Sequence, residues 1–335
     1  MKPRSHFTIT AAIVLATILA HRRMRAEASE VSEIRIAKQY GLSYLPLVVM
    51  EEQKLVEKHA RKAGLGEVKV TWPVLSGGAA TNDALISGAV DYAASGVTPL
   101  IMLWAKSHGE YKGVAAVSNT PMYLNTTKPA VKSLKDFSEK DRIALPAVKV
   151  SIQAVVLQMA AAQAFGDGNF AKLDPLTVTM KHPDGLAALL SPRSEITGHL
   201  TTPPFMYEEL ADKRVHTVLD SYDVLGGPHT QIVLLSSTAF WKKNPRAFVA
   251  VRAALEEASA FIAKNRKGAA ELYLRSTKGK QSLDEILGEI NRPGIGYATE
   301  PLRIASFGDF MVRTGSIKEK PASWKDIFFP GPEAR

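Results

Sequence analysis

The sequence predicts an α/β fold built from two successive α/β units. Three observations lead to this prediction. Short apolar segments rich in β-branched residues alternate with longer segments of helical spacing, and the alternation stops at a loop near residues 120–129 and then starts again. The chain has 335 residues, enough for two domains of ordinary size. Because crossovers between strands and helices are right-handed, we expect two mixed, mostly parallel sheets covered by helices.

The first unit begins with the strand SEIRIAKQ at residues 32–39, in which apolar and polar residues alternate. A loop leads into one long helix over residues 47–64 that ends at a glycine. The same patterns predict strands at residues 67–75, 91–95 and 113–119 and helices at residues 79–88 and 98–109, followed by a loop over residues 120–129.

The second unit repeats this alternation. SLKDFSEKDRIALPAV, residues 133–148, predicts a capped turn and a strand. GGPHTQIVLLSS, residues 226–237, is an extended segment that can return the chain to the first unit, and the rest is mainly helical. The other predicted elements are strands at residues 174–181, 195–201 and 214–220 and helices at residues 151–166, 183–191, 203–212 and 244–265.

The first 28 residues have the organisation of a secretory signal peptide. A basic start precedes an apolar run from Phe7 to Ala20, and Ala26-Glu27-Ala28 fits the small-x-small cleavage rule. The apolar run is shorter than the about 20 residues that span a bilayer. We therefore expect cleavage near Ser29 and a periplasmic protein, with a retained membrane tether as the alternative.

Composition excludes several classes of function. The chain has no cysteine, which rules out disulfides and thiolate metal sites and fits the periplasm of a bacterium. Five of the Lys and Arg residues behind the net charge of +9 lie in the signal, and no basic cluster is interleaved with aromatics, so we expect no nucleic-acid partner. The 8 histidines show no metal-ligand spacing, so no metal or other cofactor is expected. His229, in the return segment, is interpreted as a hinge residue.

Two runs of small residues stand where a strand meets a helix. In SGGAAT, residues 76–81, the Ser76 hydroxyl and the first amides of the next helix can hold an anionic or carbonyl oxygen, because glycine lets the backbone approach closely. SGVTP, residues 95–99, repeats the arrangement, and both runs would line one wall of a cleft. Tight packing of helix on sheet is the alternative. Neither run is a phosphate-binding loop or a dinucleotide fingerprint.

The loop after the first strand also overhangs this edge of the sheet. Tyr40 and Gly41 end the strand, so the Tyr40 ring can stack on a ligand or donate a hydrogen bond to it. Tyr44 is the second choice. Either ring could instead pack against its own loop.

Polar residues of the second unit form the opposite group of candidates. Ser151 is placed to cap the helix that follows it, and Lys149 lies at the same strand end as a weaker candidate. His199 lies within a predicted strand, where a lone histidine is more often a satisfied interior group than a ligand contact. Thr201 and Thr202 offer hydroxyl groups at the end of that strand.

The segment LSGGAATNDALISGAVDYAASGVTPLIMLW, residues 75–104, resembles the central signature of periplasmic solute-binding proteins of the nitrate, sulfonate and taurine class of ABC importers. GHLTTPPF, residues 198–205, is similar to the strand, loop and helix of that family's second domain. GGPHTQIVLLSSTAFWKKNP resembles its return crossover, and the likeness extends from about residue 34 to about residue 310.

The resemblance implies a two-lobed periplasmic-binding-protein fold, type II-like, with a ligand cleft between the lobes. Residues 29–125 and 232–335 would form the first lobe and residues 126–231 the second. It implies a monomeric receptor that carries a small, anionic solute, sulfonate-, taurine- or nitrate-like, to an inner-membrane ABC permease. The family's motif positions fall on Ser76, Gly77, Gly78, Ala79, Ser95, Gly96, Ser151, Gln153 and the segment from His199 through Thr201 to Thr202.

Two alternative functions stay open. One is a receptor of the type that binds thiamine-pyrimidine precursors, or a sensor subunit, which the same resemblance includes. The other is an exported enzyme, but the chain has neither a GxSxG nucleophile motif nor an HExxH zinc motif. We therefore assign no catalytic residue and expect a protein that is not an enzyme.

Overall fold

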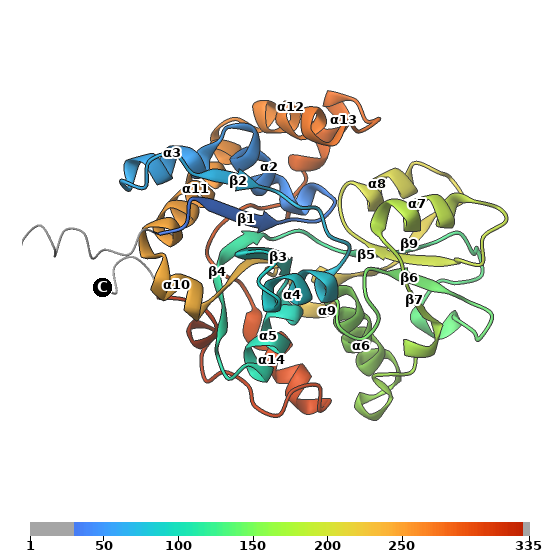
Figure 1. The fold of residues 1–335 in the computed structure, drawn as a ribbon. Coiled ribbons are helices and arrows are strands. Elements are labelled where there is room, and N and C mark those ends of the chain that lie inside the picture. The colour runs from blue at the N-terminus through green and yellow to red at the C-terminus, as the bar shows by residue number, and fades with distance from the viewer. Residues whose placement is uncertain (1–29, 331–335) are drawn as a thin grey trace, which may run out of the picture. The chain divides into compact units, whose positions relative to one another are not determined.

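The computed structural model describes residues 30–330 (Figure 1). The predicted signal peptide, residues 1–28, lies outside the described residues. Residues 32–330 form one compact unit. This unit contains two separate five-stranded sheets, each flanked by helices.

The first sheet has the order β2-β1-β3-β10-β4. Strand β1 pairs in parallel with both β2 and β3, whereas β10 lies between β3 and β4 and is antiparallel to both. Four of the five strands therefore run in one direction. The strands are β1 (Glu33–Ala37), β2 (Lys69–Thr71), β3 (Tyr92–Gly96), β4 (Tyr111–Ser118) and β10 (Ile232–Ser237).

The second sheet has the same plan, with the order β7-β6-β8-β5-β9. Here β5 lies between β8 and β9 and is antiparallel to both, while β6 pairs in parallel with β7 and β8. The sequence prediction of a loop over residues 120–129 is wrong at β5, which is too short to show a periodicity. The strands are β5 (Tyr123–Thr126), β6 (Ile143–Leu145), β7 (Thr177–Thr179), β8 (Gly198–Thr201) and β9 (His216–Asp220).

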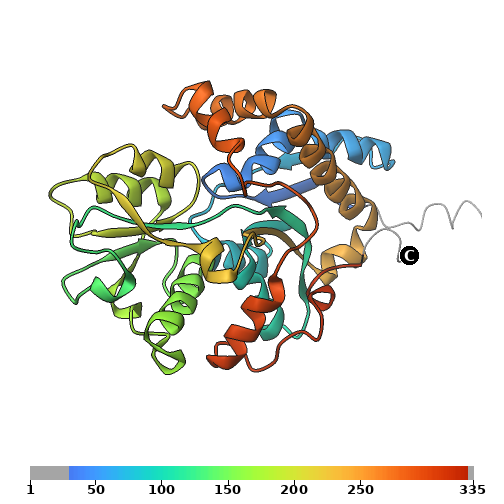
Figure 2. The ribbon, with the colours of Figure 1, turned by 180° about the vertical axis from the view of Figure 1, so that it is seen from behind.

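Each sheet with its helices is one lobe of a two-lobed fold. The chain enters the second lobe at β5 and returns to the first lobe at β10 (Figure 2). Each of these two strands is the fourth of five in its sheet. The helices are α2 (Leu45–Glu52), α3 (Leu55–Lys62), α4 (Gly78–Ile86), α5 (Val97–Lys106), α6 (Ile152–Phe165), α7 (His182–Leu190), α8 (Phe205–Leu210), α9 (Ser221–Leu225), α10 (Thr238–Lys243), α11 (Pro245–Lys264), α12 (Arg266–Thr277), α13 (Leu283–Ile290) and α14 (Ile304–Arg313).

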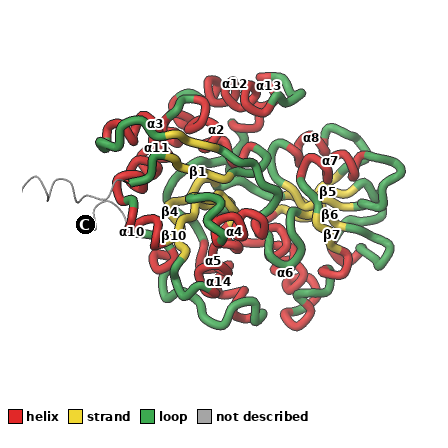
Figure 3. The backbone as a smooth tube through the Cα atoms, in the orientation of Figure 1, coloured by secondary structure: helices red, strands yellow, loops and turns green. Residues whose placement is uncertain are grey.

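The helix predicted over residues 47–64 is two helices, as Figure 3 shows at α2 and α3. Lys54 adopts the left-handed conformation, with φ 51°, and separates them. The change of direction lets the amphipathic α3 bury Leu55, Val56 and Ala60, and α3 packs against α11. Helical spacing continues through the break, so the sequence pattern gives no sign of it.

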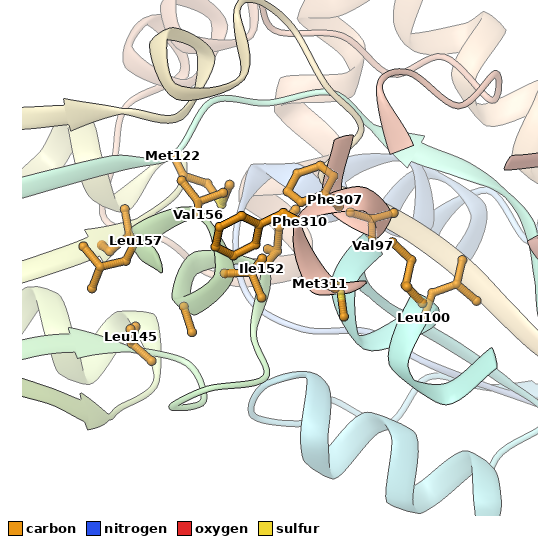
Figure 4. Close-up of a cluster of buried hydrophobic side chains, with 14 of the residues drawn as sticks. Val97, Leu100, Met122, Leu145, Ile152, Val156, Leu157, Phe307, Phe310 and Met311 are labelled. Carbon is orange, nitrogen blue, oxygen red and sulfur yellow. The ribbon is translucent and has the colours of Figure 1, made fainter. Parts of the chain in front are cut away.

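One apolar cluster joins the two lobes (Figure 4). Helix α14 contacts both α5 of the first lobe and α6 of the second. The starts of α5 and α6 are therefore held close together. The labelled members of the cluster are Val97, Leu100, Met122, Leu145, Ile152, Val156, Leu157, Phe307, Phe310 and Met311.

Candidate functional site

A small cavity of about 20 Å³ lies where the two lobes meet. Helices α4, α5, α6 and α7 all start at its wall. The first amides of a helix have no acceptor within the helix, and the helix dipole makes this end positive. The lining residues are Gln39, Tyr44, Gly78, Gly96, Pro99, Pro146, Ser151, Ile152, Gln153, His182, Thr202, Gln231 and Ile232.

Every side chain in this lining is uncharged. His182 is the only titratable group besides Tyr44 there, and burial holds the pKa of its imidazole well below the usual value, so the ring is neutral. Burial raises the pKa of the Tyr44 hydroxyl, which therefore stays protonated. The cavity offers neutral hydrogen-bond donors and helix starts, an arrangement that can hold a small anion without a cationic partner.

Three glycines let the backbone of the first lobe lie against the second lobe. A β-carbon at any of these positions would collide with an atom of the second lobe. Small residues at this boundary therefore serve contact between the lobes. The nearest atoms to the added β-carbon are the Pro203 carbonyl oxygen at 2.9 Å for Gly41, the Pro146 carbonyl oxygen at 2.8 Å for Gly77 and Ile152 Cγ2 at 2.9 Å for Gly96.

Gly78 combines two roles. It lines the cavity, and its β-carbon would lie 2.6 Å from Pro99 Cγ and 2.9 Å from Ser95 Oγ, so it also allows α4 to pack against α5. Ser95 is fully buried and does not line the cavity. Ser76 and Ala79 are exposed and lie outside the lining. The packing alternative thus applies to part of this run.

The Tyr40 loop faces a different hollow. Tyr40 and Gly41 line a groove of about 580 Å³ between α7, α8 and α12, together with Val74 and Phe205. Tyr44, the second choice on the sequence, is the tyrosine that lines the cavity. The adjacent Leu42 amide donates a hydrogen bond to the Pro203 carbonyl oxygen at 2.9 Å. This bond joins the two lobes at a point between the groove and the cavity.

Ser151 lines the cavity but its hydroxyl is committed locally. Ser151 Oγ accepts from the Ala154 amide at 3.2 Å and donates to the Ala147 carbonyl oxygen at 2.8 Å, so it caps α6. Gln153, two residues further on, lines the cavity and contacts His182. Lys149 is exposed and does not line the cavity.

The segment around His199 divides into two parts. Thr202 lines the cavity, whereas His199 and Thr201 are fully buried behind the wall. His182 and His199 lie side by side, with 3.1 Å between His182 Nδ1 and His199 Nε2, a contact that their spacing in the sequence does not indicate. Within residues 30–330, no group of three or more acidic, histidine or cysteine side chains is placed to hold a metal ion.

His229 lies away from the cavity. Its ring is fully buried, and Nε2 is 3.1 Å from the Ser221 hydroxyl of the second lobe. Burial lowers the pKa of the His229 imidazole to about 4, so the ring is neutral near pH 7.

Sequence reasoning missed several lining residues, chiefly Gln39, His182 and Gln231. Gln39 directly precedes Tyr40, so the same reasoning from the strand end could have found it. Its Oε1 accepts from the Gly77 amide at 3.1 Å, which fixes the small-residue run. Gln231 accepts a hydrogen bond from the Ser43 hydroxyl at 2.7 Å. No local motif surrounds His182, whereas Gln231 lies within the segment GGPHTQIVLLSS, which resembles the return crossover and could have drawn attention to it.

Two sheets of this order, with a cavity between the lobes, form the two-lobed fold of solved periplasmic binding proteins. Solved structures of that class share the fold. The alkanesulfonate-binding protein SsuA from Xanthomonas axonopodis pv. citri, bound to MOPS, has a TM-score of 0.67 and 20% identity over 86% of this chain and 93% of its own. The periplasmic nitrate-binding protein NrtA from Synechocystis PCC 6803 has a TM-score of 0.65 and 15% identity, covering 89% and 84%.

The periplasmic aliphatic sulphonate-binding protein SsuA from Escherichia coli is a third such structure, with a TM-score of 0.64 and 19% identity over 89% of this chain and 92% of its own. The model of the NMT1-like family matches residues 27–274. The chain therefore belongs to the NMT1-like family. No curated protein matches the sequence. None of the helices within residues 30–330 has the length and apolar character needed to cross a membrane.

Proposed function

We propose that this protein is the substrate-binding receptor of an ABC importer, which captures a small solute in the periplasm and delivers it to an inner-membrane permease. The observation that carries the proposal is the cavity between the lobes, at which four helices start. Hinge closure of two lobes around a ligand produces a closed form that a partner can recognise. The fold shared with sulfonate- and nitrate-binding proteins supports this role.

We propose a small anion as the solute. The lining has no carboxylate to repel an anion, and the amides at the starts of α4 and α6 are uncharged donors. Sulfonate-, taurine- and nitrate-like solutes are the candidates, in keeping with the proteins that share the fold. The lobes would be residues 29–125 with 232–335, and residues 126–231, except that all of β5 (Tyr123–Thr126) belongs to the second sheet.

We also propose that the protein is exported to the periplasm, is a monomer and is not an enzyme. Cleavage after Ala28 would give a mature N-terminus at Ser29, which mass spectrometry of the periplasmic protein measures directly. An intact N-terminus would instead indicate a receptor tethered to the membrane.

A thermal-shift screen tests the proposed function. The purified mature protein is heated with each member of a panel that contains sulfonates, taurine, nitrate, bicarbonate, aromatic carboxylates and pyrimidines. A solute present at 100 times its dissociation constant stabilises the folded protein by about 2.7 kcal/mol, which raises the melting temperature measurably. If neither a small anion nor the zwitterion taurine stabilises the protein and a solute without an anionic group does, the proposed anionic solute is wrong.

A further inference from the structure

A chain of buried polar side chains leads from the cavity wall into the second lobe. Gln153 Nε2 lies 3.3 Å from His182 Nε2, and His182 Nδ1 lies 3.1 Å from His199 Nε2. His199 Nδ1 is 2.5 Å from Glu209 Oε1. Glu209 and His199 are fully buried, and only Gln153 and His182 of this chain line the cavity. The chain therefore joins a buried carboxyl group to a cavity-facing amide.

At the Glu209 end of this row of side chains, the neighbouring Asn125 fixes which atoms donate and which accept hydrogen bonds. Asn125 Nδ2 donates to the Met206 carbonyl oxygen at 3.0 Å, and Asn125 Oδ1 accepts from the Thr217 hydroxyl at 2.7 Å. A carbonyl oxygen can only accept, so the Asn125 amide cannot be turned around. Its Nδ2 therefore donates to Glu209 Oε2 at 2.9 Å. Glu209 must present an acceptor there.

Proton positions along the chain follow from this end. As a carboxylate, Glu209 accepts from His199 Nδ1, and a neutral His199 then has a lone pair on Nε2. His182 is neutral and carries one ring proton, so it donates from Nδ1 to that lone pair. Thr201 Oγ1, 2.9 Å from the same nitrogen, is a second acceptor. His182 Nε2 is left as an acceptor for Gln153 Nε2.

Hydrogen-bond donation in the opposite direction, from His199 to His182, conflicts with the observed contacts. A proton on His199 Nε2 would make His182 Nδ1 the acceptor and place the single proton of His182 on its Nε2. His199 Nδ1 would then have no proton, and two acceptors, this nitrogen and the Glu209 carboxylate, would face each other at 2.5 Å. Two buried acceptors that face each other without a proton between them are costly, so the first arrangement is favoured.

We propose that Glu209 is a positioning residue which, through His199 and His182, turns the carbonyl oxygen of Gln153 toward the cavity. Gln153 Oε1 then has no protein partner within the described part of the chain, although Gln153 lines the cavity. The inference rests on the proposed function, in which the cavity holds the solute. A solute at this wall must donate a hydrogen bond, so the cargo is a small anion that carries an O–H or N–H group.

Glu209→Gln reverses the direction of the hydrogen bonds that run from residue 209 through His199 and His182 to Gln153. Because Asn125 Nδ2 stays a donor, the carbonyl oxygen of the new side chain faces it, and the new NH₂ group faces His199 Nδ1. His199 then carries its proton on Nε2, and His182 does likewise. Gln153 turns its carbonyl oxygen to His182 and its NH₂ group to the cavity.

Imidazole ¹⁵N NMR spectra test this positioning without any solute. We expect His182 and His199 to be neutral and protonated on Nδ1 in the parent protein, and protonated on Nε2 in Glu209→Gln. Thr201→Val is the matched control, since it changes a neighbour of His182 but leaves the Glu209–His199 contact, and it keeps the parental tautomers. Nε2 protonation or a charged imidazole in the parent overturns the proposal. If Glu209→Gln does not fold, the parental spectrum alone decides.

Calorimetry with two pairs of nearly isosteric anions tests the inferred cargo. Bicarbonate and sulfamate carry a donor, whereas nitrate and methanesulfonate only accept. We expect the parent to prefer the donor-bearing member of a pair by at least about tenfold and Glu209→Gln to lose or reverse this preference. Equal affinities within both pairs overturn the cargo class. If none of the four anions binds while the tautomers are as expected, the proposed anion receptor is at fault and the positioning role of Glu209 stands.

Discussion

Replacement of Gly96 by alanine tests whether the lobe contact seen here is the ligand-bound arrangement. The added β-carbon would lie 2.9 Å from Ile152 Cγ2 and 3.0 Å from Ile152 Cβ, closer than carbon atoms normally approach. Gly96 has φ −61° and ψ 156°, a conformation that alanine adopts without strain. The substitution therefore acts as a wedge between β3 and α6, with little cost to the first lobe itself.

The size of the effect follows from the overlap. Overpacking of this kind costs about 1–3 kcal/mol. If the two lobes separate in the absence of solute, that cost applies only to the closed form. At 1.4 kcal/mol for each factor of ten, the dissociation constant of the solute found in the screen would rise about 5-fold to 150-fold.

Isothermal titration calorimetry measures this change, and a melting curve without solute serves as the internal reference. Gly168→Ala is the matched control, because Gly168 is exposed and a β-carbon there has no atom within 4 Å. We expect Gly96→Ala to melt like the parent in the absence of solute and to bind more weakly. Parental affinity would show that Gly96 and Ile152 do not meet in the bound form. An equally large loss in both measurements would place the overlap within the unliganded fold.

Three further predictions concern stability. Burial and, second, the charge of Glu208 raise the pKa of the Glu289 carboxyl from 4.5 to about 8. The contribution of this carboxyl to stability is therefore fully present below pH 4.5, and up to about 5 kcal/mol of unfolding free energy is lost as the pH rises through 8; Glu289→Gln should remove this loss, as measured by urea unfolding at pH 9. Burial depresses the pKa of His229 from 6.5 to about 4, so stability is lost as the pH falls through this range, and a flat acid profile in the parent would contradict that role. Gly78→Ala should cost about 1–3 kcal/mol through its overlap with the packing of α4 on α5, whereas the exposed Ala89→Val should change stability by less than about 0.5 kcal/mol; equal melting temperatures would refute the packing role.

The sequence predicts the alternation of strands and helices well because burial imposes a period on each element. Strand β3 is entirely buried and reads as a short apolar run, and α6 is bounded by Ser151 and Gly166. Strand β5 escapes prediction because its four residues, YLNT, are too few for a periodicity. The break at Lys54 cannot be predicted because no glycine marks it; the left-handed conformation of this residue follows from the packing of α3.

The candidate site is only partly readable from the sequence. Gly78, Gly96, Ser151, Gln153 and Thr202 line the cavity, and each stands at or near a strand end or helix start, which local patterns mark. The pairing of His182 with His199 depends on how α7 lies over β8. Such contacts between distant segments leave no spacing in the chain.

The position of β10 has a consequence for the order in which the lobes can fold. All strands of the second sheet come from the continuous segment between β5 and β9, so this sheet can form as soon as that segment is available. The first sheet has β10 between β3 and β4, and β10 follows the whole second lobe in sequence. Until β10 arrives, β3 and β4 have unpaired edges. Pairing across such a large sequence separation is slow, and the first sheet cannot be completed until the chain has continued through the whole second lobe to β10.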